Sequence, residues 1–156
     1  MTWWFEDAVP DSIIEHPRGR TLTVDEHARL AWLTDNASPV HGDTHRAAQG
    51  AFGGTVVLGA LTAAIVAGLA EPATAVAPHA HRALARGWTR IVLVSTVRGG
   101  DTLAATSEIH ERRPDPDGRG GLVRRTIVGR NQRGEVVVRL EEARWIPDRD
   151  TRTTDC

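Results

Sequence analysis

The sequence contains no lysine and no tyrosine, and its single cysteine, Cys156, is the last residue. One cysteine cannot form a disulfide within the chain, and cysteine-based metal sites need several thiolates. The 19 basic residues other than histidine are all arginine, and 20 acidic residues balance them to a net charge of −1. Because no net positive charge attracts nucleic acid, we expect no nucleic-acid partner.

Long hydrophobic runs are missing as well. The most apolar segment, residues 55–69, is interrupted by Gly59, Thr62 and Gly68 and is shorter than the roughly 20 residues of a membrane-spanning helix. The first residues, Met1–Asp7, show no basic region followed by an apolar run, which a signal peptide would have. We therefore expect a cytoplasmic protein with no membrane partner.

Length and composition are those of a single globular domain. The chain has 156 residues, of which 40% are hydrophobic and 25% charged, and no internal repeat or linker divides it. Residues 148–156 are polar throughout, which is typical of a disordered terminus. The sequence predicts one domain over residues 1–147, followed by a disordered tail.

Three helices are predicted in the first half of the chain. Thr23 followed by Glu26 forms a capping box, which predicts a helix over residues 24–33. A second, short helix is expected over residues 43–49. A long third helix is expected over residues 55–69, and it is apolar nearly all round, which implies burial on every side.

The second half of the chain reads as strands. Its segments are rich in β-branched residues or alternate in polarity, and they are separated by turn sequences at Pro114–Gly118 and Asn131–Gly134. Strands are predicted over residues 88–97, 101–113, 121–131 and 135–146. The expected fold class is α+β, with an antiparallel sheet wrapped around the long central helix.

The loop from Asn36 to Asp43 is the strongest candidate for chemistry. His41 is the side chain best suited to proton transfer near neutral pH. It follows Asn36 by five residues, Pro39 stiffens the loop between them, and the apolar helix comes next. An imidazole, an amide and a helix N-terminus brought together indicate acid–base chemistry on a carbonyl compound.

Four groups of motifs occur in a fixed order along nearly the whole chain up to Trp145. They are Trp4–Asp7 with His16–Thr21, His41–Ala47 with Phe52-Gly53, Gly100–Leu103, and Gly129–Val137. In sequence and order these motifs resemble the MaoC-like hot-dog family of dehydratases and (R)-specific enoyl-CoA hydratases. Within that family the chain is most similar to the mesaconyl-CoA hydratase-like branch, which likewise has Asn five residues before the histidine.

The resemblance implies a hot-dog fold, a homodimer and a substrate held as a thioester of coenzyme A or acyl carrier protein. The reaction it implies is the reversible addition of water across an α,β-unsaturated acyl thioester. We predict no metal site, because His79 and His81 have no Glu or Cys nearby and the chain contains no HExxH sequence. We also expect no cofactor.

The resemblance also implies roles for individual residues. His41 would transfer protons, and the backbone N–H of Gly59 would hold the thioester oxygen as negative charge develops on it. Leu58 occupies a position that is usually His or Asn in relatives. Leu58, Val57, Asp35 and Trp32 are further expected contacts of the substrate.

Asn36 stands where relatives usually have an aspartate, and this leaves several interpretations open. Asn36 can orient the attacking water but cannot accept its proton, so His41 would do the proton transfer alone; this is the interpretation we prefer. Asp35, one residue away, could take the acidic role instead. Asn36 could also simply end the preceding helix, since asparagine tolerates a left-handed conformation. Asp43 is expected to cap the next helix.

Two other functions compete with hydration. Thioesterases of this fold generally need a carboxylate, and residues 55–70 contain none, so only Asp35 or Asp43 could supply it. The chain could also be a non-enzymatic member of the family, which binds an acyl thioester without catalysis or serves as a structural subunit.

Overall fold

The computed structural model describes residues 4–71 and 84–149, so His79, His81 and Cys156 lie outside the described residues. One antiparallel sheet of five strands organises the chain, in the order β1-β3-β4-β5-β2. The strands are β1 (Ile13–Thr21), β2 (Leu84–Leu93), β3 (Thr102–Pro114), β4 (Gly120–Arg130) and β5 (Val136–Pro147). The predicted α+β fold with its antiparallel sheet is confirmed.

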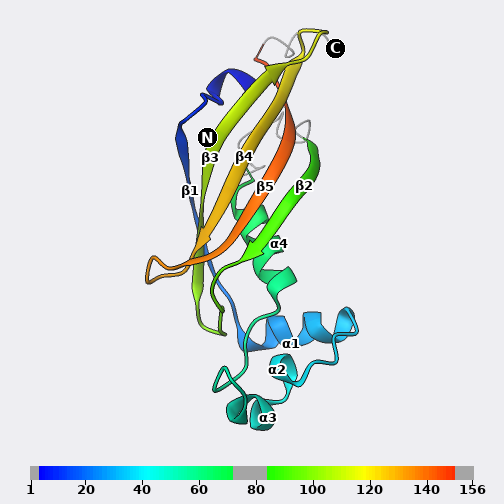
Figure 1. The fold of residues 1–156 in the computed structure, drawn as a ribbon, viewed down its shortest axis with the longest axis vertical. Helices are drawn as coiled ribbons and strands as arrows, with labels where there is room; N and C mark the ends of the chain where they lie inside the picture. The colour runs from blue at the N-terminus through cyan, green and yellow to red at the C-terminus, as the bar shows by residue number, and fades with distance from the viewer. Residues whose placement is uncertain (1–3, 72–83, 150–156) are drawn as a thin grey trace.

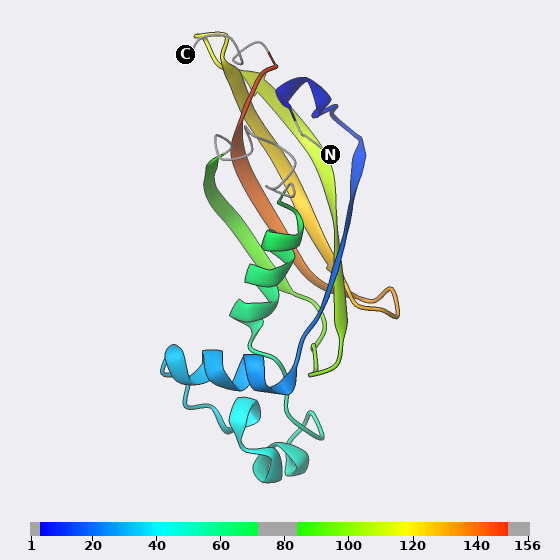
Figure 2. The same cartoon turned by 180° about the vertical axis from the view of Figure 1, so that it is seen from behind.

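Helix α4 (Gly59–Leu69) lies along one face of this sheet, as Figures 1 and 2 show. Its buried residues Val66 and Leu69 pack into the main core with Leu103, Ile127 and Leu140 of the sheet. No described helix is long and apolar enough to cross a membrane.

The approach of α4 to the sheet requires a glycine. A Cβ atom at Gly129 on β4 would lie 2.5 Å from Cγ2 of Val66 and 2.9 Å from Cγ1 of Val138. Such distances are impossible in a packed core, so any side chain at residue 129 would push the helix away from the sheet.

Two expectations about the long helix are wrong. The helix begins at Gly59 rather than Thr55: residues 55–58 are not helical, and the Val57 N–H bonds to Val97 O at 2.7 Å. The helix is also not buried on every side. Ala60, Ala64 and Gly68, spaced four residues apart, form an exposed stripe of small side chains in this single chain.

Three shorter helices gather beyond one end of the sheet, near the N-terminus of α4 (Figure 1). They are α1 (Val24–Leu33), α2 (Pro39–Gly42) and α3 (Thr44–Gln49). The predicted capping box of α1 is present, since the side chains of Thr23 and Glu26 each accept a hydrogen bond from the other residue's N–H. Asp43 caps α3 by accepting from the Arg46 N–H at 2.9 Å, as expected.

Strand β1 was not predicted from the sequence, and β2 lies earlier than residues 88–97. Pro17 and Gly19 break the alternation that marks a strand, and the pairing of β1 with β3 shifts register between His16 and Gly19. An edge strand tolerates such an irregularity because only one side of it is hydrogen-bonded within the sheet.

The short 3₁₀ helix η1 (Phe5–Asp7) lies at the opposite end of the sheet from α1–α3 (Figure 1). The first residues of the expected tail reach it. The guanidinium of Arg149 pairs with Asp7, and the Arg149 N–H donates to Glu6 at 3.2 Å. The rest of the tail, residues 150–156, lies outside the described residues, so the domain boundary at 147 stays a prediction.

A polar cluster lies within the core beneath the C-terminal end of α4. Arg125 is fully buried, pairs with Glu142 at 2.7 Å, and also donates to Ala70 O and Ser107 Oγ. His16 joins the cluster through Nε2, which lies 2.8 Å from Ser107 Oγ. Burial, followed by the charges of Arg125 and Arg18, lowers the pKa of His16 to about 4.

Because His16 has a lowered pKa, we expect the stability of the folded chain to decrease in acid. The unfolded chain protonates His16 near pH 6.5, whereas the folded chain keeps it neutral to about pH 4, so stability falls as pH drops through that window. Since His16 is partly exposed to solvent, we expect the free energy of unfolding to decrease by about 1–2 kcal/mol. Denaturant unfolding between pH 7 and 4.5 measures this decrease. In His16→Gln the free energy of unfolding should depend less on pH than in wild type. Equal slopes for the two proteins would rule the effect out.

Candidate active site

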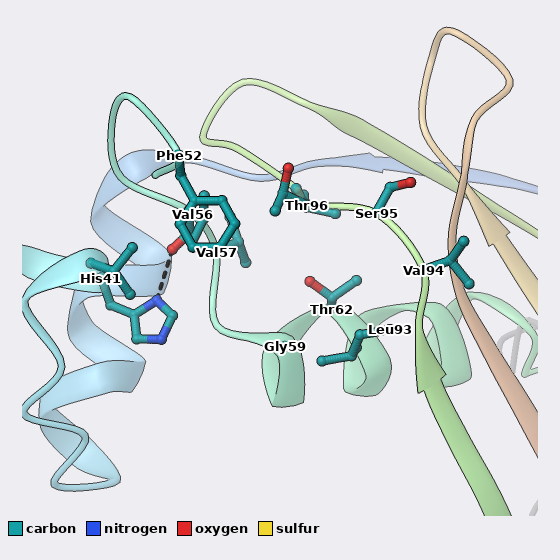
Figure 3. A pocket seen from close by; sticks show the side chains of 12 residues that line it. His41, Phe52, Val56, Val57, Gly59, Thr62, Leu93, Val94, Ser95 and Thr96 are labelled. Atoms are coloured by element: carbon teal, nitrogen blue, oxygen red, sulfur yellow. Dashed lines mark hydrogen bonds between the residues drawn. The ribbon is translucent and has the colours of Figure 1, made fainter. Parts of the chain in front are cut away.

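His41 is held in one orientation by a backbone carbonyl. Its Nδ1 lies 2.8 Å from Val56 O, fifteen residues along the chain (Figure 3). A carbonyl oxygen only accepts, so Nδ1 carries the proton of this bond. In the neutral ring Nε2 then keeps its lone pair, which makes it the nitrogen able to accept a proton.

The ring of His41 borders a cavity of about 370 Å³ between α2, the start of α4 and the end of β2. Most of the residues in its walls are apolar, and three that carry a hydroxyl group are Thr62, Ser95 and Thr96. Figure 3 shows Thr62 on the first turns of α4, on the cavity side of the helix. The remaining lining residues are Val40, Phe52, Val56, Val57, Gly59, Leu93, Val94 and Val97.

The N-terminus of α4 opens into the same cavity. Gly59 is the first residue of the helix, and its N-cap, Leu58, supplies no side-chain acceptor. The N–H groups of a first helical turn have no acceptor within the helix and carry partial positive charge. A Cβ at Gly59 would lie 2.2 Å from Cδ1 of Leu93, so a glycine keeps this helix end close to β2.

An imidazole and a helix N-terminus thus border one mostly apolar cavity. Such an arrangement can transfer a proton at one wall and stabilise a negatively charged oxygen at another. Among the residues that line the cavity in the described chain, none is an aspartate or glutamate. The described residues also contain no cluster of His, Cys, Asp and Glu able to hold a metal ion.

The predicted site residues divide into two groups. His41, Val57 and Gly59 line the cavity, and Leu58 is buried beside it. The other group, Asn36, Asp35 and Trp32, does not line the cavity in this chain. These residues lie at the C-terminal end of α1, where Trp32 is 80% exposed.

A Schellman motif explains the position of these three residues. The Asp35 N–H bonds to Trp32 O at 3.1 Å and the Asn36 N–H bonds to Ala31 O at 2.8 Å. The left-handed residue is Asp35, with φ of 52°, rather than Asn36. The Asn36 side chain then accepts a hydrogen bond from the Ser38 N–H at 3.1 Å, which shapes the turn into α2.

Sequence reasoning missed the polar residues Thr62, Ser95 and Thr96, and also His27. Ser95 and Thr96 follow β2, and nothing in the local sequence indicates that this strand ends beside α4. His27 on α1 is 1% exposed, and neither ring nitrogen has a hydrogen-bond partner among the described residues. Burial, and to a lesser extent the charge of His41, lowers the pKa of His27, so its ring is neutral.

Comparisons with known proteins agree with this architecture. Residues 7–127 match the family model described as a MaoC like domain. A solved structure of a monoamine oxidase regulatory protein from Archaeoglobus fulgidus is 26% identical, with a TM-score of 0.80 over 94% of this chain and 95% of that one.

Two further solved structures share the fold at lower identity. A MaoC-like dehydratase from Rhodospirillum rubrum is 24% identical, with a TM-score of 0.80 over 94% of this chain and 98% of that one. An (R)-hydratase from Pseudomonas aeruginosa is 22% identical, with a TM-score of 0.73 over 93% of this chain and 86% of that one. No protein of curated function matches this chain.

Proposed function

This chain belongs to the MaoC-like domain family, and on that premise we propose that it is a hydratase or dehydratase of acyl thioesters. The substrate would be an α,β-unsaturated acyl group, or its β-hydroxy counterpart, carried on coenzyme A or acyl carrier protein. The observation that carries the proposal is the fixed imidazole of His41, whose Nε2 is the free base beside a cavity that also receives the N-terminus of α4.

The proposed hydration needs one base and one oxyanion site. Nε2 of His41 takes a proton from water as the water oxygen bonds to Cβ of the substrate. The electron pair moves to the thioester oxygen, where the Gly59 N–H stabilises it. The imidazolium then returns its proton to Cα, which balances the reaction without a second acid. Dehydration follows the same steps in reverse.

The lining of the cavity favours this reaction over hydrolysis. Hot-dog thioesterases generally need a carboxylate that activates water or attacks the thioester. Asp43 is engaged as the cap of α3, and Asp35 is exposed at the end of α1. Neither lines the cavity in the described chain.

The homodimer is part of the same proposal. Strand β2 is an edge of the sheet, and it exposes Trp88, Ile91 and Leu93. The exposed stripe of α4 is apolar too. A second copy pairing along β2 would cover the exposed side chains of β2 and the stripe of α4. The cavity lies next to this proposed interface, because Leu93 lines the cavity and also belongs to the exposed edge of β2. We further propose that the protein is cytoplasmic and that it belongs to the mesaconyl-CoA hydratase-like branch of the family.

An assay with two simultaneous readouts tests the function. The purified protein is incubated with crotonyl-CoA, mesaconyl-CoA and β-hydroxyacyl-CoA substrates while enoyl absorbance and free thiol are followed. We expect a change in the enoyl signal without thiol release for at least one substrate. Thiol release would indicate a thioesterase, and binding without either signal would indicate a non-catalytic protein.

A pair of variants tests how Asn36 acts. If Asn36 works by shaping the turn into α2, Asn36→Asp keeps an acceptor for the Ser38 N–H and should retain activity, whereas Asn36→Ala should lose about tenfold in kcat. A large gain by Asn36→Asp on short linear enoyl-CoA would instead place residue 36 in contact with the attacking water. Steady-state kinetics on crotonyl-CoA separates these outcomes.

A further inference from the structure

The side chain of Arg98 clamps a loop that reaches the active site. Its guanidinium donates to Thr55 O at 3.3 Å and also to Phe52 O. Arginine is suited to this role because its planar group presents several donors in a fixed geometry. One charged side chain therefore fastens two carbonyls of the segment 52–55.

Within that segment the Gly53 N–H bonds to Gly50 O at 3.0 Å, and two consecutive glycines form the turn. Gly53 and Gly54 have φ values of 63° and 155°, which lie in the region that favours glycine. At its far end the loop is also tied by two backbone bonds: the Val56 N–H donates to Val40 O at 3.2 Å, and the Val57 N–H donates to Val97 O at 2.7 Å. Arg98 thus holds the part of the loop that precedes these two bonds.

The clamped loop continues directly into the carbonyl that orients His41. Thr55, whose oxygen binds Arg98, precedes Val56, whose oxygen receives the Nδ1 proton of His41. A shift of the loop would move this carbonyl relative to the ring. The position of the Arg98 guanidinium is therefore coupled to the orientation of the imidazole through one peptide unit.

The backbone of Arg98 is itself firmly placed. Its N–H donates to Asp101 Oδ2 at 2.9 Å, and the Asp101 N–H returns a bond to Arg98 O at 3.1 Å. Asp101 is 5% exposed, and its other oxygen accepts from Gln132 at 2.8 Å. Burial alone would raise the pKa of Asp101, but these hydrogen bonds and the charge of Arg133 lower it, so the anchor is an anion.

We propose that Arg98 is a positioning residue, which holds the Val56 carbonyl against His41 Nδ1 and thereby keeps Nε2 as the free base. Without the clamp, the loop moves, the Nδ1 bond weakens, and the ring populates the tautomer protonated at Nε2. The catalytic consequence rests on the proposed function, whereas the tautomer is a property of the protein alone.

The test compares Arg98→Ala and Arg98→Lys with Arg112→Ala. Arg112 is a matched control, because it also donates to two backbone carbonyls, those of Phe5 and Glu6, at the far end of the sheet. We expect Arg98→Ala to lower kcat about 10–100-fold with KM changed less than about threefold, since small misplacements of a catalytic group have such effects. Arg98→Lys should fall between wild type and Arg98→Ala, and Arg112→Ala should match wild type.

NMR of the imidazole nitrogens supplies a readout that does not depend on activity. In wild type, His41 should give the signals of a ring protonated at Nδ1, identified by their loss in His41→Gln, and Arg98→Ala should give a tautomer mixture. An unchanged tautomer in Arg98→Ala overturns the proposal, whether or not kcat falls. If wild type hydrates no thioester but the tautomer still responds, the proposed function fails and the positioning role stands. Arg98→Lys provides the same readout if Arg98→Ala does not fold.

Discussion

Replacing His41 with alanine is expected to lower kcat for hydration of an enoyl thioester by about 10²–10⁴-fold, the usual contribution of a general acid–base group. In the proposed mechanism this imidazole moves every proton, because no carboxylate lines the described cavity. KM should change little, since the substrate is held mainly by the apolar walls and the helix end. Steady-state kinetics on crotonyl-CoA measures both constants.

His45→Ala is the matched control for this substitution. His45 lies on α3, is exposed, and pairs with Gln49 at 3.1 Å rather than with the loop at Val56. Its removal should leave kcat unchanged. Near-normal turnover by His41→Ala would show that the base has been assigned to the wrong residue.

Replacing Gly59 with proline is expected to lower kcat by about 10²–10³-fold, as the loss of an oxyanion donor does in other enzymes. Proline removes the N–H that is proposed to bind the thioester oxygen. The helix itself should tolerate the change, because proline is favoured at the first helical position. Leu58, with φ of −56° and ψ of 127°, already has the conformation required before a proline.

Gly59→Ala separates the lost donor from the added bulk. It keeps the N–H but adds a Cβ that must displace Cδ1 of Leu93, the end of a flexible side chain. We expect Gly59→Ala to lose less than about tenfold in kcat, well short of the proline variant. Equal losses in the two variants would mean that bulk, and not the missing N–H, is responsible.

Much of the fold could be predicted from local sequence. Thr23 and Glu26 mark the start of α1 within three residues of each other, and Asp43 likewise marks the start of α3. Strands β3, β4 and β5 alternate clearly and are joined by short turns, so their predicted ends agree with the structure to within one residue. These features depend on interactions between near neighbours in the chain.

The errors arose where distant contacts decide the structure. Residues 55–58 look helical, but the Val57 N–H bonds to the carbonyl of Val97, forty residues away, instead of joining the helix. The irregular strand β1 exists because β3 pairs with it. The stripe at Ala60, Ala64 and Gly68 is exposed because a five-stranded sheet covers only one side of α4.

In the site, too, the features that depend on local sequence could be predicted and those that depend on distant contacts could not. His41 could be singled out from its motif and Gly59 from the family resemblance, and both line the cavity. The partner of His41 is a carbonyl, which every residue has, so no sequence pattern identifies Val56 as that partner. Asn36 could be located but its role could not, because its contact with Ser38 depends on the left-handed turn at Asp35.

The destination of the oxygen from water tests the central claim most directly. Crotonyl-CoA is incubated with the protein in water labelled with heavy oxygen, and the products are fragmented in a mass spectrometer. The account predicts the label on the β-carbon hydroxyl of an intact thioester, and its loss with His41→Ala. Label in a free carboxylate alongside released coenzyme A, or no incorporation from any enoyl thioester, would contradict it.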